Sequence, residues 1–200
     1  MATERTYLRR FSRTERALHW IHASSFLALL ASGLVLYVPS LSERVARRPL
    51  VKDVHVYTAI AWIVLLALVV AVGDRRGLRG TLRELDLFDE DDRLWLRGAR
   101  RPQGRFNAGQ KLNAAFTASF AVLFSVSGLL LWYGERDTRF RFASTILLHD
   151  GLMYVALVLL VGHLYLAVIH PATRHALRGI TLGTVREDWA ARHHAKWRPE

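Results

Sequence analysis

The sequence predicts an all-α membrane protein, a four-transmembrane-helix bundle with both termini in the cytoplasm. Four apolar runs of about twenty residues are each long enough to cross about 30 Å of hydrocarbon. They comprise residues 20–38, 54–72, 112–133 and 146–169. A chain of 200 residues is too short to cover four such helices with a polar shell, which disfavours a soluble helical core.

Charge placement predicts the orientation. Lys and Arg number 21 in the N-terminal segment, the middle loop and the C-terminal tail, against 7 in the other two connections. Since cytoplasmic segments carry the excess of Lys and Arg, both termini and the middle loop are expected in the cytoplasm. The net charge of +11 then reflects topology and contact with anionic lipid, and nucleic-acid binding is not needed to explain it.

The elements follow in order within one domain, residues 1–200. Helices are expected at about 18–38, 53–73, 111–133 and 145–170, with a cytoplasmic loop at 74–110 and a cytoplasmic tail at 171–200. Arg9, Arg10, Arg13 and Arg16 precede the first run as in a signal peptide, but the run is long and ends in no clear cleavage site, so its retention as a helix is favoured. Residues 81–97 mix apolar and acidic side chains, as in an amphipathic surface segment.

The chemistry rests on histidine. The chain has no Cys, which excludes disulfides, iron–sulfur clusters and covalent haem attachment in this chain. His149 and His163 are fourteen residues apart in one apolar run, so they share a helix face at about 21 Å of rise. Ionisable groups inside a membrane segment are costly and are usually functional.

The predicted topology groups four histidines by depth. His19 and His163 fall near the cytoplasmic side, and His55 and His149 near the periplasmic side. A b-type haem takes one axial imidazole from each of two facing helices, so the pattern predicts two haem b groups. His22 and His170 share faces with proposed ligands and are alternates. Each histidine near an interface could instead hydrogen-bond lipid headgroups.

Small residues recur at the same two depths. Gly33 lies fourteen residues after His19, and Ala114 and Gly128 are also fourteen apart. Such gaps suit a flat macrocycle. The pairs Ser32-Gly33 and Ser127-Gly128 could equally serve close helix packing.

Residues 106–111 lead into the third helix. Asn107 and Gln110 offer hydrogen-bond donors and acceptors, and Gly109 allows close approach, which suits a carbonyl-bearing ring. From the residues alone, an ordinary helix cap with Asn107 as the N-cap is favoured.

The chain resembles the cytochrome b (gamma) subunits of membrane-bound respiratory formate dehydrogenases. The resemblance runs along nearly the whole chain. Its most specific parts are the Asn-Ala-Gly-Gln-Lys run at 107–111 and the tail motifs Gly179-Ile180, Trp189-Ala190 and His193-His194. The histidine pattern itself is shared with hydrogenase cytochromes b.

This resemblance implies a function. His55 with His149 and His19 with His163 would be the axial ligands of two haem b groups, and Asn107, Gly109 and Gln110 would belong to a quinone site for menaquinone or ubiquinone. It also implies a periplasmic iron–sulfur subunit, a molybdenum or tungsten catalytic subunit that oxidises formate, and a place in the bacterial inner membrane. The chain would be the quinone-reducing electron-transfer subunit of that enzyme, with no formate-oxidising residue of its own.

Two alternatives remain open. A cytochrome b of a hydrogenase or another membrane dehydrogenase would keep both haems and bind a different partner. A haem-free, proton-coupled membrane protein or anchor would use the histidines as relays. The absence of evident internal repeats makes a transporter less favoured.

Overall fold

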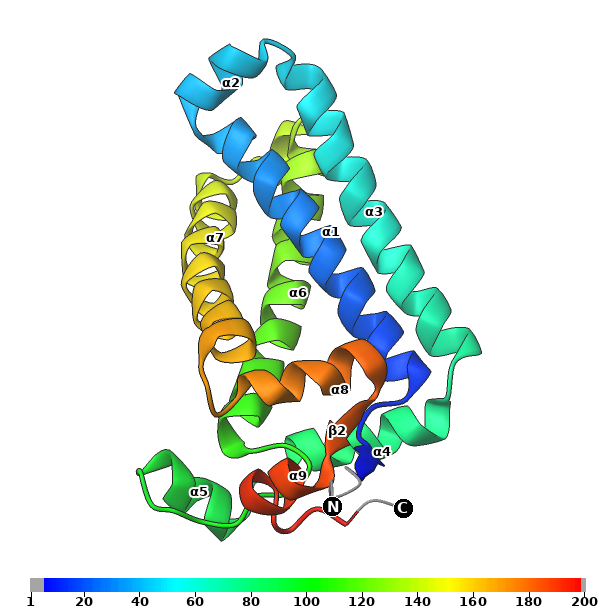
Figure 1. Cartoon of the computed structure of the whole chain (residues 1–200). Helices are drawn as coiled ribbons and strands as arrows, with labels where there is room; N and C mark the ends of the chain where they lie inside the picture. The colour runs from blue at the N-terminus through cyan, green and yellow to red at the C-terminus, as the bar shows by residue number, and fades with distance from the viewer. Residues whose placement is uncertain (1–5, 199–200) are drawn as a thin grey trace. The chain divides into compact units, whose positions relative to one another are not determined.

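The computed structural model describes residues 6–198 and is mostly helical (Figure 1). Four helices are long and apolar enough to cross a membrane, each within five residues of its predicted bounds. They are α1 (Arg13–Tyr37), α3 (Arg48–Val72), α6 (Ala108–Gly134) and α7 (Ala143–Leu164), which the π-helical turn η2 (Tyr165–Ile169) continues. Large apolar side chains on them are exposed, such as Leu147 at 77 %, as expected for surfaces that face lipid.

Shorter elements fill the connections. They are α2 (Pro39–Val45), α4 (Arg75–Asp86), α5 (Glu90–Leu96), η1 (Thr138–Phe140), η3 (Arg174–Ala176), α8 (Leu177–Leu182) and α9 (Glu187–His193). The predicted amphipathic segment at 81–97 thus falls on α4 and α5. Both predicted cytoplasmic termini, residues 1–5 and 199–200, lie outside the described residues.

The prediction of a purely α-helical class was incomplete. Two three-residue strands, β1 (Tyr7–Arg9) and β2 (Thr184–Arg186), pair antiparallel with Leu8 opposite Val185. Gly183, which ends α8 and directly precedes β2, has a φ of 86°, a left-handed conformation that favours glycine.

Local signals explain where the long helices begin and end. Ser12 and Glu15 form a capping box at the start of α1, because each side chain accepts a hydrogen bond from the other's backbone N–H. Pro39 follows the end of α1 and opens α2. Pro171 ends η2, because the residue before a proline avoids helical geometry, and His170 is extended with φ −63° and ψ 123°.

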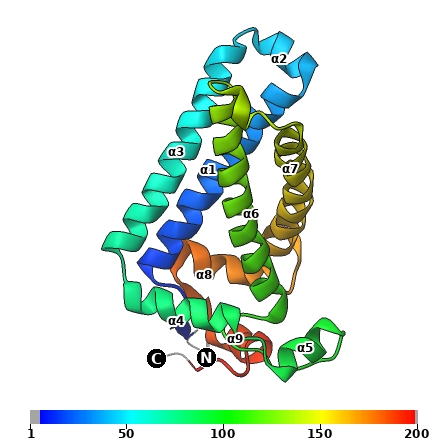
Figure 2. The ribbon, with the colours of Figure 1, turned by 180° about the vertical axis from the view of Figure 1, so that it is seen from behind.

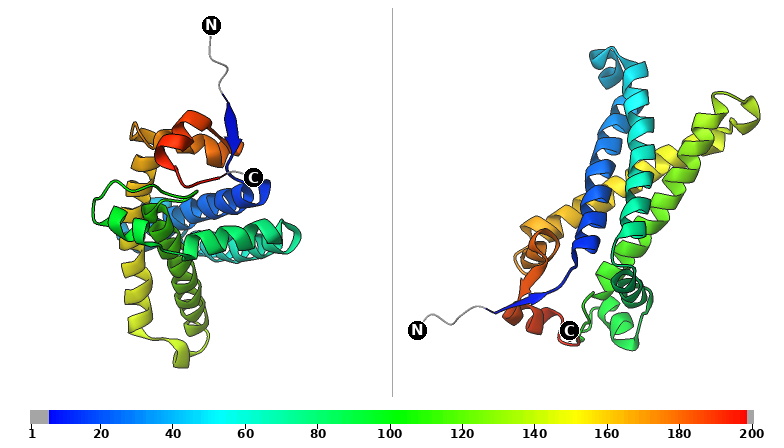
Figure 3. Two further views of the ribbon diagram at one scale, coloured as in Figure 1. Left: turned by 90° about the horizontal axis from the view of Figure 1, so that it is seen from below. Right: turned by 90° about the vertical axis from the view of Figure 1, so that its right-hand side faces the viewer.

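The chain divides into two compact units, described separately below. The first unit comprises Met1–Arg16, Arg75–Val122 and Val155–Glu200, and the second comprises Ala17–Asp74 and Leu123–Tyr154. The first unit has a small core of Val185, Trp189 and Ala190. β1 lies beside the C-terminal elements that form it (Figure 3).

In the second unit α1 and α3 run side by side (Figures 1 and 3). The chain passes from α6 to α7 through η1, as Figure 2 shows from behind. Polar contacts join the helices near these connections. Tyr154 Oη donates to Tyr37 Oη at 2.8 Å, and Lys52 Nζ lies 2.6 Å from Glu135 Oε2.

Candidate functional site

The second unit brings two of the predicted histidines together. His55 near the start of α3 and His149 near the start of α7 have ring centres 6.4 Å apart and planes inclined by 69°. Two imidazoles on opposite sides of one metal ion, each at the roughly 2 Å usual for metal–imidazole bonds, have ring centres roughly 6 Å apart. The pair therefore has the separation that a shared iron needs.

Each of these imidazoles has a serine behind it. Ser32 Oγ on α1 lies 2.9 Å from His55 Nδ1, and Ser127 Oγ on α6 lies 2.8 Å from His149 Nδ1. Because Nδ1 is engaged, Nε2 is the nitrogen left for a metal on each ring. The sequence interpretation considered both serines only as packing residues.

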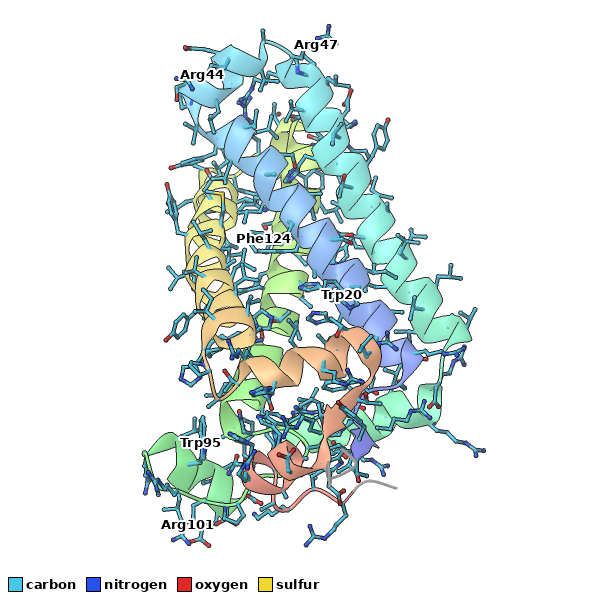
Figure 4. The ribbon with its side chains drawn as sticks, viewed as in Figure 1. Trp20, Arg44, Arg47, Trp95, Arg101 and Phe124 are labelled. Atoms are coloured by element: carbon cyan, nitrogen blue, oxygen red, sulfur yellow. The ribbon has the colours of Figure 1, made fainter. Side chains whose placement is uncertain are left out.

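The glycines after these serines let the imidazole rings lie close to the backbones of α1 and α6. A Cβ on Gly33 would lie 3.4 Å from His55 Cε1, and one on Gly128 would lie 3.4 Å from His149 Cε1. Phe124, labelled in Figure 4, packs edge-on against His149 with ring centres 5.2 Å apart. An aromatic side chain therefore lies beside His149 as well as the serine.

Among the described residues, no group of three or more His, Cys, Asp or Glu side chains could hold a metal ion. An isolated ion bound by protein side chains usually needs three or four ligands. A haem iron needs only two from the protein, since the porphyrin supplies the others. His55 and His149 are two imidazoles with ring centres 6.4 Å apart, which fits the two ligands that a haem iron takes from a protein.

The second predicted pair, His19 and His163, belongs to different units. His19 on α1 packs edge-on against Trp20, with ring centres 5.3 Å apart, and His163 lies near the end of α7. Their pairing at one iron stays a prediction.

The alternate histidines have other partners. His22 lies against Trp62 of α3, with ring centres 5.5 Å apart, and stacks on Phe26. His170 lies beyond η2, where its Nδ1 is 3.2 Å from Thr173 Oγ1. Both histidines stay alternates, because His19 and His149 have aromatic contacts of the same kind.

The predicted quinone residues form the first turn of α6 in the first unit. Asn107 Oδ1 accepts from the Gln110 N–H at 2.9 Å, and Gln110 Oε1 accepts from the Asn107 N–H at 3.0 Å. Asn107 therefore caps α6, as the residues alone favour, and its quinone role, which the resemblance implies, stays a prediction. Gly109 admits Trp95 of α5 (Figure 4), because a Cβ on Gly109 would lie 3.3 Å from its Cη2.

A buried arginine that the sequence interpretation did not assign lies beside this turn. Arg10 is 2 % exposed, and its Nη2 donates to the Arg105 carbonyl at 2.7 Å and to Gln110 Oε1 at 3.3 Å. The rings of Phe11 and Trp189 lie 5.3 and 5.4 Å from its Cζ. Burial, followed by the charge of Arg105, lowers the pKa of Arg10 to about 10. The guanidinium of Arg10 thus lies near the Phe11 and Trp189 rings in cation–π geometry. It also donates a hydrogen bond to the Gln110 amide oxygen.

Arg105 anchors the N-terminal segment to α4. Its Nη1 donates to Glu15 Oε1 at 2.9 Å and its Nη2 to Thr81 Oγ1 at 2.6 Å. Its side chain and that of Glu15 are only 12 % and 11 % exposed. This half-buried network fixes the start of α1 beside the loop that leads into α6.

Facing histidines on apolar helices are the arrangement in which membrane cytochromes hold a b-type haem. The chain belongs to the prokaryotic cytochrome b561 family, whose model matches residues 10–183. This finding agrees with the histidine pattern and with four helices fit to span a membrane.

Several curated relatives are similar over most of their length. The formate dehydrogenase cytochrome b556(fdo) subunit of Escherichia coli (strain K12) is 27% identical over 94% of this chain and 90% of its own. The formate dehydrogenase cytochrome b556 subunit of Haemophilus influenzae is 23% identical over 91% of this chain and 78% of its own. The nitrate-inducible formate dehydrogenase cytochrome b556(Fdn) subunit of E. coli (strain K12) is 20% identical over 92% of this chain and 86% of its own. The resemblance found in the sequence is confirmed.

Proposed function

We propose that this chain is the di-haem b membrane subunit of a respiratory formate dehydrogenase. It would take electrons from a periplasmic iron–sulfur subunit and deliver them to a quinone at the cytoplasmic side of the inner membrane. The observation that carries the proposal is the facing pair His55 and His149, with ring centres 6.4 Å apart. The similarity to formate dehydrogenase cytochrome b subunits over most of the chain supports the choice of complex.

The axial ligands follow from the histidine positions. His55 and His149 would hold the periplasmic haem b, and His19 and His163 would hold the cytoplasmic one. Bound haem iron supplies one-electron transfer. The protein's part is to fix the imidazoles, as Ser32 and Ser127 do for the first pair.

The quinone, menaquinone or ubiquinone, would bind at the first turn of α6. The amide oxygens of Asn107 and Gln110 cap the helix there by accepting backbone hydrogen bonds. Arg10 donates a hydrogen bond to Gln110 Oε1. The Asn107 and Gln110 amides also carry N–H donors that can face a quinone carbonyl. Since quinone reduction consumes protons, a site on the cytoplasmic side would make electron transfer charge the membrane.

The charge distribution supports the orientation. All 21 Lys and Arg of the N-terminal segment, the middle loop and the tail would face the cytoplasm. The proposal keeps a single di-haem membrane domain, residues 1–200, in which the four long helices would form one bundle. The iron–sulfur subunit and the molybdenum or tungsten catalytic subunit would sit on the periplasmic side.

The first test is the haem content. The chain is purified in detergent after expression with haem available, and its dithionite-reduced minus oxidised spectrum is recorded with a pyridine haemochrome assay. Two haem b per chain are expected. A colourless protein would overturn the proposal in favour of a haem-free relay or anchor.

A second test separates formate dehydrogenase from other complexes. In the intact complex, His163→Ala should abolish formate-dependent quinol formation and leave formate oxidation by an artificial dye intact. Unchanged quinol formation would refute the assignment of His163. Co-purification with hydrogenase subunits, with no formate-oxidising subunit, would favour the hydrogenase alternative.

A further inference from the structure

We infer that Ser32 and Ser127 are positioning residues that set the tautomer and the donor strength of His55 and His149. Each serine would accept the Nδ1–H of its histidine, so that Nε2 carries the lone pair for iron. This inference rests on the proposed function, because it assumes that the two imidazoles share a haem.

The direction of the hydrogen bonds follows from counting protons. A hydroxyl has one proton to donate. Ser32 Oγ donates it to the Ala28 carbonyl at 2.8 Å, and Ser127 Oγ donates it to the Leu123 carbonyl at 2.6 Å. A carbonyl can only accept, so each hydroxyl proton is already used. With the hydroxyl proton on the carbonyl, each serine oxygen is left to accept from the Nδ1–H beside it.

Each serine also lies near a second backbone carbonyl. Ser32 Oγ lies 3.2 Å from the Leu29 carbonyl and Ser127 Oγ lies 3.4 Å from the Phe124 carbonyl. These carbonyls can only accept as well, so they do not change the direction of the bonds to the two imidazoles.

Ordinary packing of serine in a membrane helix does not account for these contacts. Ser24 on α1 donates to the Trp20 carbonyl, four residues earlier, at 2.8 Å. Ser32 and Ser127 likewise donate to the carbonyl four residues earlier in their own helices. That bond alone satisfies a serine in an apolar helix. Ser32 and Ser127 add a histidine at 2.9 and 2.8 Å, on two different helices and each just before a glycine. The repeated arrangement favours a shared task.

The expected consequence is electronic as well as geometric. A hydrogen bond from Nδ1–H makes an imidazole a stronger electron donor and fixes its rotation. Stronger donation favours ferric over ferrous iron and lowers the midpoint potential of that haem. Losing an outer partner of a metal-binding histidine typically costs about 10-fold in affinity. If the ferric form bears that loss, the potential rises by about 59 mV for one electron.

The test compares four variants in the purified haem-loaded chain: Ser127→Ala, Ser32→Ala, Ser32→Thr and Ser24→Ala. Redox titration followed at the haem absorption bands should show one haem shifted upward in both Ser127→Ala and Ser32→Ala. Ser32→Thr keeps a hydroxyl and should restore the wild-type potential. Ser24→Ala removes only the carbonyl bond and should shift neither haem.

The outcomes separate the two levels of the proposal. A wild-type chain that binds no haem refutes the proposed function itself. If the wild-type chain binds two haems but Ser32→Ala and Ser127→Ala have the same haem potentials as Ser24→Ala, the serine role is refuted. The proposed function then still stands. If Ser127→Ala fails to fold, the comparison of Ser32→Ala with Ser32→Thr decides the point.

Discussion

Asn107 and Gln110 hold each other at the start of α6 through two reciprocal hydrogen bonds of 2.9 and 3.0 Å. A cap of this kind is worth about 1 kcal/mol. We expect Asn107→Ala to lower the free energy of unfolding in mild detergent by about that amount, while Asn107→Ser, whose shorter side chain still caps, keeps most of it. Chemical or thermal unfolding followed by circular dichroism measures the difference.

The same two variants separate capping from quinone binding. If Asn107 also contacts the quinone, Asn107→Ser should retain stability and lose quinone-inhibitor affinity, since serine lacks the amide. Equal inhibitor affinity in wild type and Asn107→Ser would confine Asn107 to the cap.

The long helices could be predicted because apolar composition over about twenty residues is a strong signal. Their starts were harder to predict. The third helix was expected from residue 111 and begins at Ala108, because the Asn107 cap extends it beyond the apolar run. The β1–β2 pair could not be predicted, since three residues at each end of the chain carry no periodicity.

The site was predicted in the same uneven way. His55 and His149 could be matched by depth because the topology follows from charge and hydropathy. The serine contacts depend on helix rotation, which sequence spacing leaves undetermined between neighbouring helices. The burial of Arg10 was also beyond prediction, because its setting depends on Trp189, almost the whole chain away.

Glu15 offers a test of the network that fixes the start of α1. Its carboxylate accepts from Arg105 Nη1 at 2.9 Å and from Thr81 Oγ1 at 2.7 Å. Glu15→Gln keeps the shape and removes the charge, so we expect a loss of about 2 kcal/mol in unfolding free energy. Glu84→Gln is the matched control, because Glu84 contacts the same Arg105 but its side chain is 49 % exposed. The control should cost below about 1 kcal/mol, and equal losses in both variants would contradict the role of burial.

His194 predicts a pH dependence of stability. Burial, and then the charge of Arg10, lower the pKa of His194 to about 3, while its Nδ1 contacts the Gly104 carbonyl. Between about pH 6.5 and 3 the unfolded chain therefore binds a proton that the folded chain does not, so stability falls as the pH falls. From pH 7 to pH 5 this group should cost roughly 2 kcal/mol. His194→Asn, which can still donate to Gly104, should lose that part of the slope.

The measurement for His194 is the unfolding free energy of both proteins at pH 7 and pH 5. Other titrating groups contribute equally to both, so the difference between the two slopes isolates His194. Parallel slopes would show that His194 is protonated in the folded chain or exposed before unfolding.

The pairing of His55 with His149 makes a prediction about additivity. If both imidazoles bind one iron, His55→Ala and His149→Ala should each remove the same haem, and the double variant should lose no more than either single one. His19→Ala should remove the other haem. His22→Ala should keep both, because the proposal assigns His19, and not His22, to the cytoplasmic haem. A pyridine haemochrome count with redox titration distinguishes these cases, since the remaining haem keeps its own potential. If the His55 and His149 variants each removed a different haem, the depth pairing would be wrong and the iron would take its second ligand from another helix.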